Sequence, residues 1–279
     1  MNLCSPNYVR QVLSEIDFSP GKSMGQNFLV DANILQLIAK HADIGPDDQV
    51  VEVGPGLGTL TEALVAKAER VIAIEKDRKL HSFLEDRFAQ VANLELRNAD
   101  ALQTDWQEIA SGGARKFVSN LPYSVASRIL VDIFRMSPKL DRIVVMLQSD
   151  VAARMVAECG GRERGLMSVL AQRCYRVDLV KHVGPNCFIP RPRVGSSIVV
   201  CRVRERPLAD VDDEDFFLRI VKMTFTHRRK TIPNALRGAG LGRDQVANVM
   251  ERLKIEPLLR PENLTVEQWA SISESLLHS

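Results

Sequence analysis

Between Gln49 and Leu147, short apolar runs alternate with segments in which apolar residues recur at helical spacing. This alternation is typical of repeated strand–helix units, which build a mainly parallel sheet covered by helices. The predicted strands are Val50–Val53, Val71–Ile74, Leu94–Leu96, Phe117–Ser119 and Ile143–Leu147. The predicted helices are Leu60–Lys67, Lys79–Phe88, Ala126–Phe134 and one that begins at Asp150, with Thr59 and Ser124 available as N-caps. We therefore expect an α/β fold.

Two further strands are predicted after this alternation. Arg173–Val183 and Ser197–Arg204 are rich in β-branched residues, so they can extend the sheet as an antiparallel hairpin. The loop around Pro185–Pro192 would join them.

The sequence changes character at about Pro207. An acidic stretch, Asp210–Asp215, opens segments with apolar residues at helical spacing, punctuated by proline and glycine. We therefore expect an α/β domain over residues 1–207 and a small helical domain over residues 208–279.

Composition narrows the class of protein. Of 279 residues, 45% are hydrophobic and 26% are charged, as in ordinary globular proteins. No apolar run approaches the ~20 residues needed to cross a bilayer, and the N-terminus lacks the apolar core of a signal peptide, so a cytoplasmic protein is expected. The five cysteines show no metal-ligand spacing, which predicts free buried thiols and no metal site. A mildly basic C-terminal third permits a polyanionic partner.

A glycine-rich segment, Glu52–Gly58, follows the first predicted strand and precedes a helix. Glycines at such a turn let a ligand approach the backbone, although the run alone is a weak signal. Glu75 ends the second strand, where a carboxylate can accept hydrogen bonds from both ribose hydroxyls of a cofactor. Nicotinamide cofactors and S-adenosylmethionine fit this geometry alike.

Two residues favour S-adenosylmethionine. Asp100 ends the third strand, where its carboxylate can accept a hydrogen bond from an adenine amine, although it could also cap a turn. The dinucleotide fingerprint requires a third glycine at the position that Thr59 occupies.

A candidate methyl-acceptor site follows the fourth strand in Asn120-Leu121-Pro122-Tyr123. The Asn120 amide oxygen and the Leu121 carbonyl could both accept hydrogen bonds from an adenine N6, which would stabilise the positive charge that develops there during methyl transfer. Tyr123 could stack on the base and Phe188 on its opposite face. The alternatives are an ordinary turn and a core phenylalanine.

The order of these motifs resembles that of the ribosomal RNA adenine N6,N6-dimethyltransferases of the KsgA type, over nearly the whole chain. Further segments that follow the patterns of this family are Gly25-Gln26-Asn27-Phe28-Leu29, Gln148–Arg154, Phe188–Val194 and Phe225–Lys230. The resemblance implies a Rossmann-like class I S-adenosylmethionine-dependent methyltransferase fold, in which residues 1–48 form an N-terminal helical and lid segment. It also implies a monomeric enzyme that dimethylates two adjacent adenosines in the loop of the last helix of small-subunit (16S) ribosomal RNA, in the 30S subunit or its precursor.

The same resemblance implies roles for individual residues. The residues expected to bind S-adenosylmethionine are Gln26, Asn27, Leu29, Gly54, Gly56, Glu75, Asp100, Ala101 and Asn120. Those expected to form the adenosine pocket are Asn120, Leu121, Tyr123 and Phe188. Those expected to bind RNA phosphates are Arg191, Arg193, Arg228, Arg229 and Lys230. Ser124, Arg164 and Gly195 depart from the family pattern without removing a group that the chemistry needs.

Three other functions are compatible with parts of the sequence. A large-subunit (23S) rRNA adenine methyltransferase of the resistance type would share the fold and most motifs. An RNA-binding ribosome-assembly factor could keep the fold with dispensable catalysis. A nicotinamide dehydrogenase is disfavoured because no acid–base histidine or Tyr–Lys pair is apparent near the predicted crevice.

Overall fold

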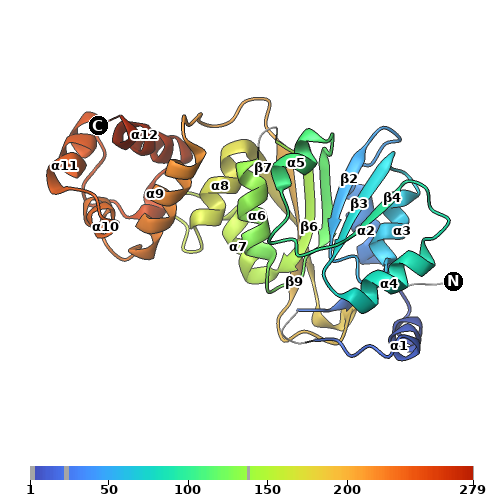
Figure 1. Cartoon of the computed structure of the whole chain (residues 1–279). Coiled ribbons are helices and arrows are strands. Elements are labelled where there is room, and N and C mark those ends of the chain that lie inside the picture. Colours follow the sequence, from blue (N-terminus) through green and yellow to red (C-terminus); the bar gives the residue numbers. More distant parts are fainter. Residues whose placement is uncertain (1–3, 22–24, 137–138, 279) are drawn as a thin grey trace. The chain divides into compact units, whose positions relative to one another are not determined.

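A computed structural model describes residues 4–21, 25–136 and 139–278 of the chain. Within them a seven-stranded sheet has the order β4-β3-β2-β5-β6-β9-β7 (Figure 1). The parallel strands are β2 (Gln49–Val53), β3 (Arg70–Glu75), β4 (Leu94–Asn98), β5 (Lys116–Asn120) and β6 (Arg142–Gln148). β9 (Ser196–Val203) pairs antiparallel with β6, and β7 (Tyr175–Val183) forms the edge. The predicted parallel strands are confirmed, each with one or two further residues.

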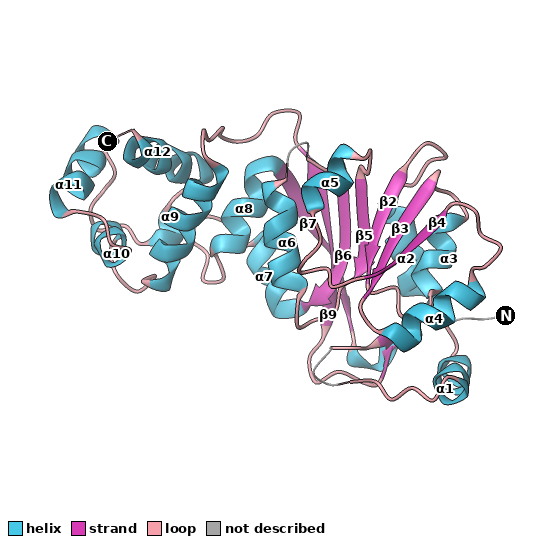
Figure 2. Ribbon diagram, in the orientation of Figure 1, coloured by secondary structure: helices cyan, strands magenta, loops and turns pink. Residues whose placement is uncertain are grey.

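The helices of this α/β part lie in the connections between strands, as Figure 2 shows. They are α2 (Ala32–Ala42), α3 (Thr59–Val65), α4 (Arg78–Arg87), α5 (Trp106–Ser111), α6 (Ala126–Arg135) and α7 (Ser149–Val156), and α1 (Pro6–Glu15) precedes them. The predicted bounds of α3, α4 and α6 hold within two residues, whereas the short helix α5 was not predicted.

Both predicted N-caps are wrong. Gly58 occupies the cap of α3 with φ 76°, and Thr59 is already the first helical residue. Val125 occupies the cap of α6, and no side chain bonds to the helix there. The Pro122 carbonyl instead accepts hydrogen bonds from the Val125 and Ala126 amides, at 3.2 and 3.1 Å, so a backbone turn leads directly into the helix.

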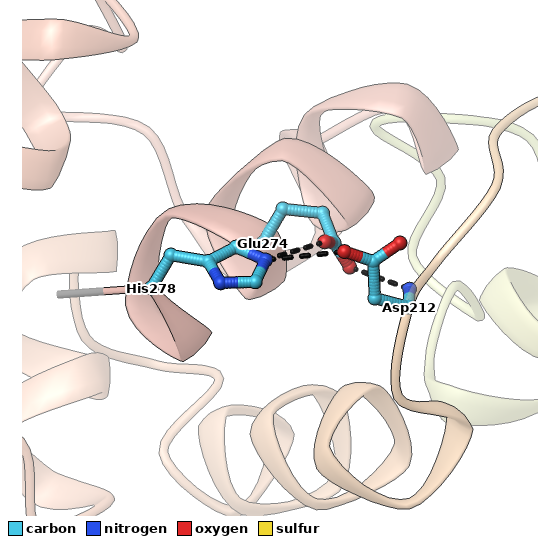
Figure 3. Close-up of side chains that lie close together, drawn as sticks. All are labelled: Asp212, Glu274 and His278. Atoms are coloured by element: carbon cyan, nitrogen blue, oxygen red, sulfur yellow. Dashed lines mark hydrogen bonds and ion pairs between the residues drawn. The ribbon is translucent and has the colours of Figure 1, made fainter.

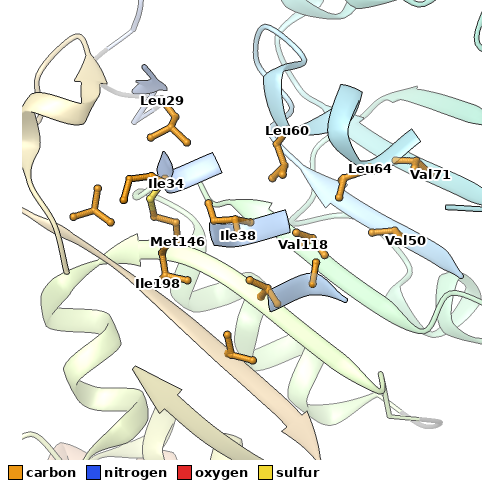
Figure 4. Close-up of a cluster of buried hydrophobic side chains, with 14 of the residues drawn as sticks. Leu29, Ile34, Ile38, Val50, Leu60, Leu64, Val71, Val118, Met146 and Ile198 are labelled. Carbon is orange, nitrogen blue, oxygen red and sulfur yellow. The ribbon is translucent and has the colours of Figure 1, made fainter. Parts of the chain in front are cut away.

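An aliphatic core covers one face of the sheet (Figure 4). Alternate residues of neighbouring strands point to the same face, among them Val50, Val118 and Met146. They pack against Ile38 from α2 and Leu64 from α3, both fully buried. Burial of such side chains contributes about 25 cal/mol per Å² of apolar surface and holds the strand ends in fixed register.

A second, two-stranded sheet joins distant parts of the chain. β1 (Phe28–Leu29) pairs antiparallel with β8 (Phe188–Ile189), so that Leu29 lies opposite Phe188. The Val30 amide extends this pairing by donating to the Cys187 carbonyl at 2.8 Å. The segment before α2 is therefore anchored to the loop between β7 and β9.

The chain divides into two compact units: Met1–Ala152 with Asp178–Val203, and Ala153–Val177 with Arg204–Ser279. The chain returns to the second unit at Arg204, close to the predicted boundary of residues 207–208. Residues 153–177 also belong to this unit, although the prediction assigned them to the first domain. The physical reason is that α8 (Leu166–Cys174) packs on α9 (Glu214–Thr226) and α12 (Val266–Leu277).

The second unit is helical, as predicted, and has its own core. Its other helices are α10 (Ile232–Gly238) and α11 (Arg243–Arg252). Trp269 and Phe217 are fully buried, and the ring centroids of Trp269 and Phe225 lie 5.5 Å apart. An ion pair between buried Arg173 of α8 and partly exposed Glu214 of α9 adds to this packing.

A polar contact ties the segment before α9 to the end of α12 (Figure 3). The His278 Nε2 lies 3.1 Å from the Asp212 carboxylate. The backbone amide of Asp212 donates a hydrogen bond to the Glu274 carboxylate at 3.0 Å. These three side chains lie close enough together to share a metal ion. Among the described residues, no other group of three or more histidine, cysteine or acidic side chains does so. The contacts among them account for their arrangement.

In the described ranges, no helix combines the length and the apolar character that crossing a membrane requires. All five cysteines are free, as predicted. Cys4, Cys174 and Cys201 are buried, but Cys159 is exposed and Cys187 is half-buried, so the prediction that all are buried is wrong for two.

Candidate active site

The glycine-rich turn between β2 and α3 packs closely on the loop that follows β5. Gly54 has φ 68°, a conformation that side chains other than glycine rarely adopt. A Cβ at Gly54 would lie 2.9 Å from the Pro122 ring. Glycine at this position therefore brings the two strand-end loops together.

Glu75, at the end of β3, faces this turn. Its carboxylate accepts hydrogen bonds from the Gly56 amide at 3.2 Å and the Asp77 amide at 2.9 Å, and the residue is 5% exposed. Burial raises the pKa of Glu75 to about 7, and the two amide bonds oppose that rise. Glu75 thus titrates close to neutral pH.

Glu52 lies one residue before the end of β2 and is fully enclosed. The Thr61 hydroxyl donates to its carboxylate at 2.7 Å. Burial raises the pKa of Glu52 to about 8, with a smaller contribution from the charge of Glu75. The carboxyl group of Glu52 is therefore mostly protonated at neutral pH.

Asp100 follows β4 and carries its charge at neutral pH. The Lys76 ammonium lies 2.8 Å from one carboxylate oxygen, and the Leu102 amide donates to the other at 3.0 Å. The hydrogen bond from Lys76, with that from Leu102, holds the pKa of Asp100 below its usual value. Asp100 is thus an ionised hydrogen-bond acceptor.

Asn120 ends β5 and bonds to the segment before β1. Its side-chain amide donates to the Asn27 carbonyl at 3.3 Å, and the Asn27 side chain donates to the Gly25 carbonyl at 3.0 Å. The next amide, that of Leu121, donates to the Met146 carbonyl on β6 at 3.0 Å. The side-chain nitrogen of Asn120 thereby donates a hydrogen bond within the protein, and its side-chain oxygen can accept a hydrogen bond from a ligand.

A cavity of about 360 Å³ opens where these strand ends meet. Ligands of α/β sheets bind at the carboxyl ends of the strands, which is where this cavity lies. The predicted site residues that line it are Gln26, Asn27, Leu29, Gly54, Gly56, Glu75, Asp100, Ala101, Asn120, Leu121 and Tyr123. The structure therefore brings together all the residues predicted to bind the cofactor and all but one of those predicted to bind the target base.

Phe188 is the exception. Its side chain is 3% exposed and packs in the aliphatic core with Leu29 and Ile198, and it is not among the residues that line the cavity. Pairing of β8 with β1 places it there. A stacking role for Phe188 stays a prediction.

The basic residues predicted to bind RNA lie in different units. Arg191 and Arg193 are exposed in the loop between β8 and β9. Arg229 and Lys230 are exposed just after α9. Arg228 is half-buried, and its guanidinium donates to the Arg162 carbonyl at 2.7 Å.

Several cavity residues were not predicted from the sequence. Lys76, Ser124 and Arg128 contribute polar groups, and Phe28 and Leu57 contribute apolar walls. Lys76 could have been found from its place next to Glu75. Arg128 comes from the first turn of α6, and only the fold directs it here.

A family model and curated relatives match nearly the whole chain. The model of a family described as ribosomal RNA adenine dimethylase matches residues 18–278. The chain is 40% identical to ribosomal RNA small subunit methyltransferase A of Moorella thermoacetica, over 99% of both chains. It is 37% identical to the protein of the same name from Clostridioides difficile, over 97% of this chain and 96% of that one.

Solved structures share the fold. A dimethyladenosine transferase from Plasmodium falciparum superposes with a TM-score of 0.76 and 23% identity, over 88% of this chain and 95% of that one. The 23S rRNA methyltransferase ErmE superposes with a TM-score of 0.65 and 26% identity, over 90% of this chain and 99% of that one. These likenesses confirm the predicted Rossmann-like methyltransferase fold.

Proposed function

Because the chain belongs to the ribosomal RNA adenine dimethylase family, we propose that its substrate is a pair of adjacent adenosines in the loop of the 3′-terminal helix of small-subunit ribosomal RNA. The chain is an S-adenosylmethionine-dependent enzyme that dimethylates adenine in ribosomal RNA. The observation that carries the proposal is the position of Asn120, Leu121 and Tyr123 in the same cavity as Glu75 and Asp100.

The residues of the cavity fit S-adenosylmethionine. Gly54 and Gly56 of the glycine-rich turn line the cavity, and its volume of about 360 Å³ is in the range of ligand pockets. Glu75 would accept hydrogen bonds from the ribose hydroxyls, and ionised Asp100 from the adenine amine. When bound, the cofactor supplies a methyl group on a sulfonium.

The remaining cofactor contacts in this proposal come from the turn after β2 and from the segments before β1 and after β4. They are Gln26, Asn27, Leu29, Gly54, Gly56, Ala101 and Asn120. No metal is needed for this chemistry, because hydrogen-bond acceptors of the protein stabilise the charge that develops.

Asn120 and Leu121 would activate the target base. The lone pair of an adenine N6 is delocalised into the ring, which makes it a poor nucleophile. Acceptors aimed at the N6 hydrogens favour a pyramidal nitrogen and stabilise the positive charge as the methyl group arrives. The Asn120 amide oxygen can serve as such an acceptor, since the amide nitrogen is oriented by the hydrogen bond that it donates to the Asn27 carbonyl.

The base must leave its stack to enter the cavity, a step that costs a few kcal/mol and is easiest in a loop. Tyr123 would stack on it, and Phe188 would do so only if its side chain left the core position described above. The pocket must also accept a base that already carries one methyl group, because each adenosine is methylated twice.

Substrate RNA would contact exposed Arg191 and Arg193 in the α/β unit and exposed Arg229 and Lys230 in the helical unit, with half-buried Arg228 next to them in the chain. Such contacts position a nucleic acid without specifying its sequence. In this proposal the C-terminal helices at residues 208–279 dock RNA and the α/β part within residues 1–207 is catalytic. The monomer is the active form, and the partner is the 30S subunit or its precursor.

The small-subunit target is favoured over the large-subunit one by the similarity of whole chains. Relatives named small subunit methyltransferase A reach 40% identity over 99% of the chain, whereas the 23S rRNA methyltransferase ErmE reaches 26% over 90%. An assembly factor with dispensable catalysis is disfavoured by the intact arrangement of Asn120, Leu121 and Tyr123 around the cavity.

The test is to map the product. The protein is incubated with S-adenosylmethionine and ribosomal subunits from cells that lack the modification, and RNA fragments are analysed by mass spectrometry. Dimethyladenosine at two adjacent positions near the small-subunit 3′ end is expected. Methylation of large-subunit RNA would overturn the target, and cofactor binding without product on either subunit would favour the assembly factor.

A further inference from the structure

The side chain of Tyr123 is held at its far end by a residue of another strand. Its hydroxyl forms a short hydrogen bond with the Ser196 hydroxyl. Ser196 is the first residue of β9, lies opposite Gln148 of β6 in the sheet register, and is fully buried. The partner of Tyr123 is therefore fixed by the sheet itself.

The backbone of Tyr123 is confined as well. A Cβ at Gly25 would lie 3.1 Å from the Tyr123 amide nitrogen, so the two backbones are in close contact. The preceding residue, Pro122, packs on Gly54, and the Leu121 amide is bonded to the Met146 carbonyl at 3.0 Å. With its backbone packed and its hydroxyl bonded, the Tyr123 ring has one orientation in the cavity wall.

We propose that Ser196 is a positioning residue, which holds the Tyr123 ring in the plane that the target adenine needs for both methyl transfers. This inference rests on the proposed function. Stacking is useful only when the ring is in place before the base arrives, because an ordered ring loses no further freedom on binding. Ser196 does not line the cavity and acts through Tyr123.

The second transfer is the step that depends most on this hydrogen bond. After the first transfer the N6 carries a methyl group and only one hydrogen, so fewer hydrogen bonds from N6 to Asn120 and Leu121 remain to orient the base. Stacking on a fixed ring must then supply more of the orientation. A mobile ring would release the base after one methylation.

Two variants remove the hydrogen bond from opposite sides. Ser196→Ala deletes the partner, and Tyr123→Phe keeps the ring but deletes its hydroxyl. Each is expected to raise KM for the RNA by about threefold to tenfold, the scale of one neutral hydrogen bond, and to raise the fraction of N6-monomethyladenosine among the products. The double variant should be no worse than either single variant, because both remove the same bond.

Ser197→Ala is the matched control. Ser197 is the next residue of β9, is also fully buried, and bonds to Ser149 at 3.1 Å and His182 at 2.9 Å rather than to Tyr123. It should keep the wild-type KM and product ratio. A smaller amount of active enzyme also raises the monomethyl fraction at a fixed time. The product ratios are therefore compared at equal total methylation, where a changed ratio of monomethyl to dimethyl product reports on positioning.

The outcomes separate the two claims. Wild-type protein that makes no dimethyladenosine overturns the proposed function, and the role of Ser196 with it. Wild-type protein that is active, with Ser196→Ala and Tyr123→Phe both at the wild-type KM and product ratio, overturns only the role of Ser196. The role of Ser196 is also contradicted if the increases in KM and in the monomethyl fraction add in the double variant, or if they appear equally in Ser197→Ala.

Discussion

The Glu75 carboxylate accepts a hydrogen bond from the Gly56 amide at 3.2 Å, which ties the end of β3 to the glycine-rich turn after β2. The same carboxylate is the group proposed to accept from the ribose hydroxyls of the cofactor. Because burial raises its pKa to about 7, the charge of this acceptor changes in the neutral range.

Cofactor affinity should therefore depend on pH. Donors from the ribose favour the ionised form of Glu75, so binding of S-adenosylmethionine should strengthen as pH rises through about 7 and should release a proton. Glu75→Gln should weaken binding by about tenfold to a hundredfold and remove this dependence. Calorimetry in buffers of different ionisation enthalpy measures both effects, and a pH-independent wild type would contradict the assignment.

Glu52 should make stability fall as pH rises. Its pKa is about 8 in the folded protein against 4.5 for an ordinary glutamate, so the folded state holds a proton that the unfolded chain loses. The contribution of Glu52 to the free energy of unfolding is fully present below about pH 4.5 and is lost as pH rises through about 8. Glu52→Gln should flatten this slope, by an amount on the order of a few kcal/mol across the range. Urea unfolding at several pH values is the measurement, and an unchanged slope would count against the assignment.

Gly58 should not tolerate a side chain. It has φ 76°, and a Cβ there would lie 2.5 Å from the Phe88 ring. Gly58→Ala should therefore cost on the order of 3 kcal/mol of unfolding free energy, from backbone strain and overpacking together. Gly184→Ala is the control, because Gly184 has φ −70° and no neighbouring atom within 4 Å of its Cβ position. Equal stability of the two variants would rule out this explanation.

Exposed cations after α9 should contribute to RNA affinity. Arg229→Glu should weaken binding and reduce the slope of log affinity against log salt by about one, because a phosphate contact releases about one counterion. Lys222→Glu on α9 changes the charge equally at another exposed position and serves as the control. Filter binding across a salt series separates the two, and identical slopes would argue against docking at Arg229. Cofactor affinity should not change in either variant.

The sequence predicts the parts of this site that local patterns encode. Most of the parallel strands are buried apolar runs, and β4 is a half-buried strand, so the strand ends, and with them Glu75, Asp100 and Asn120, could be placed within two residues. The core position of Phe188 could not, because it depends on pairing with Leu29 across 159 residues of chain. The hydrogen bond between Tyr123 and Ser196 and the grouping of residues 153–177 with the C-terminal helices also depend on contacts between distant parts of the chain, so local patterns do not predict them.

One cavity is proposed to hold both the cofactor and the target adenosine, with Asn120 in contact with each. The direct measurement compares Asn120→Ala with wild type in single-turnover methyl transfer at saturating cofactor and in the Kd for S-adenosylmethionine. The rate should fall by about a hundredfold to a thousandfold, the scale of a lost transition-state hydrogen bond, while the Kd changes far less. A loss of affinity as large as the loss of rate would instead make Asn120 a cofactor-positioning residue and contradict the claim.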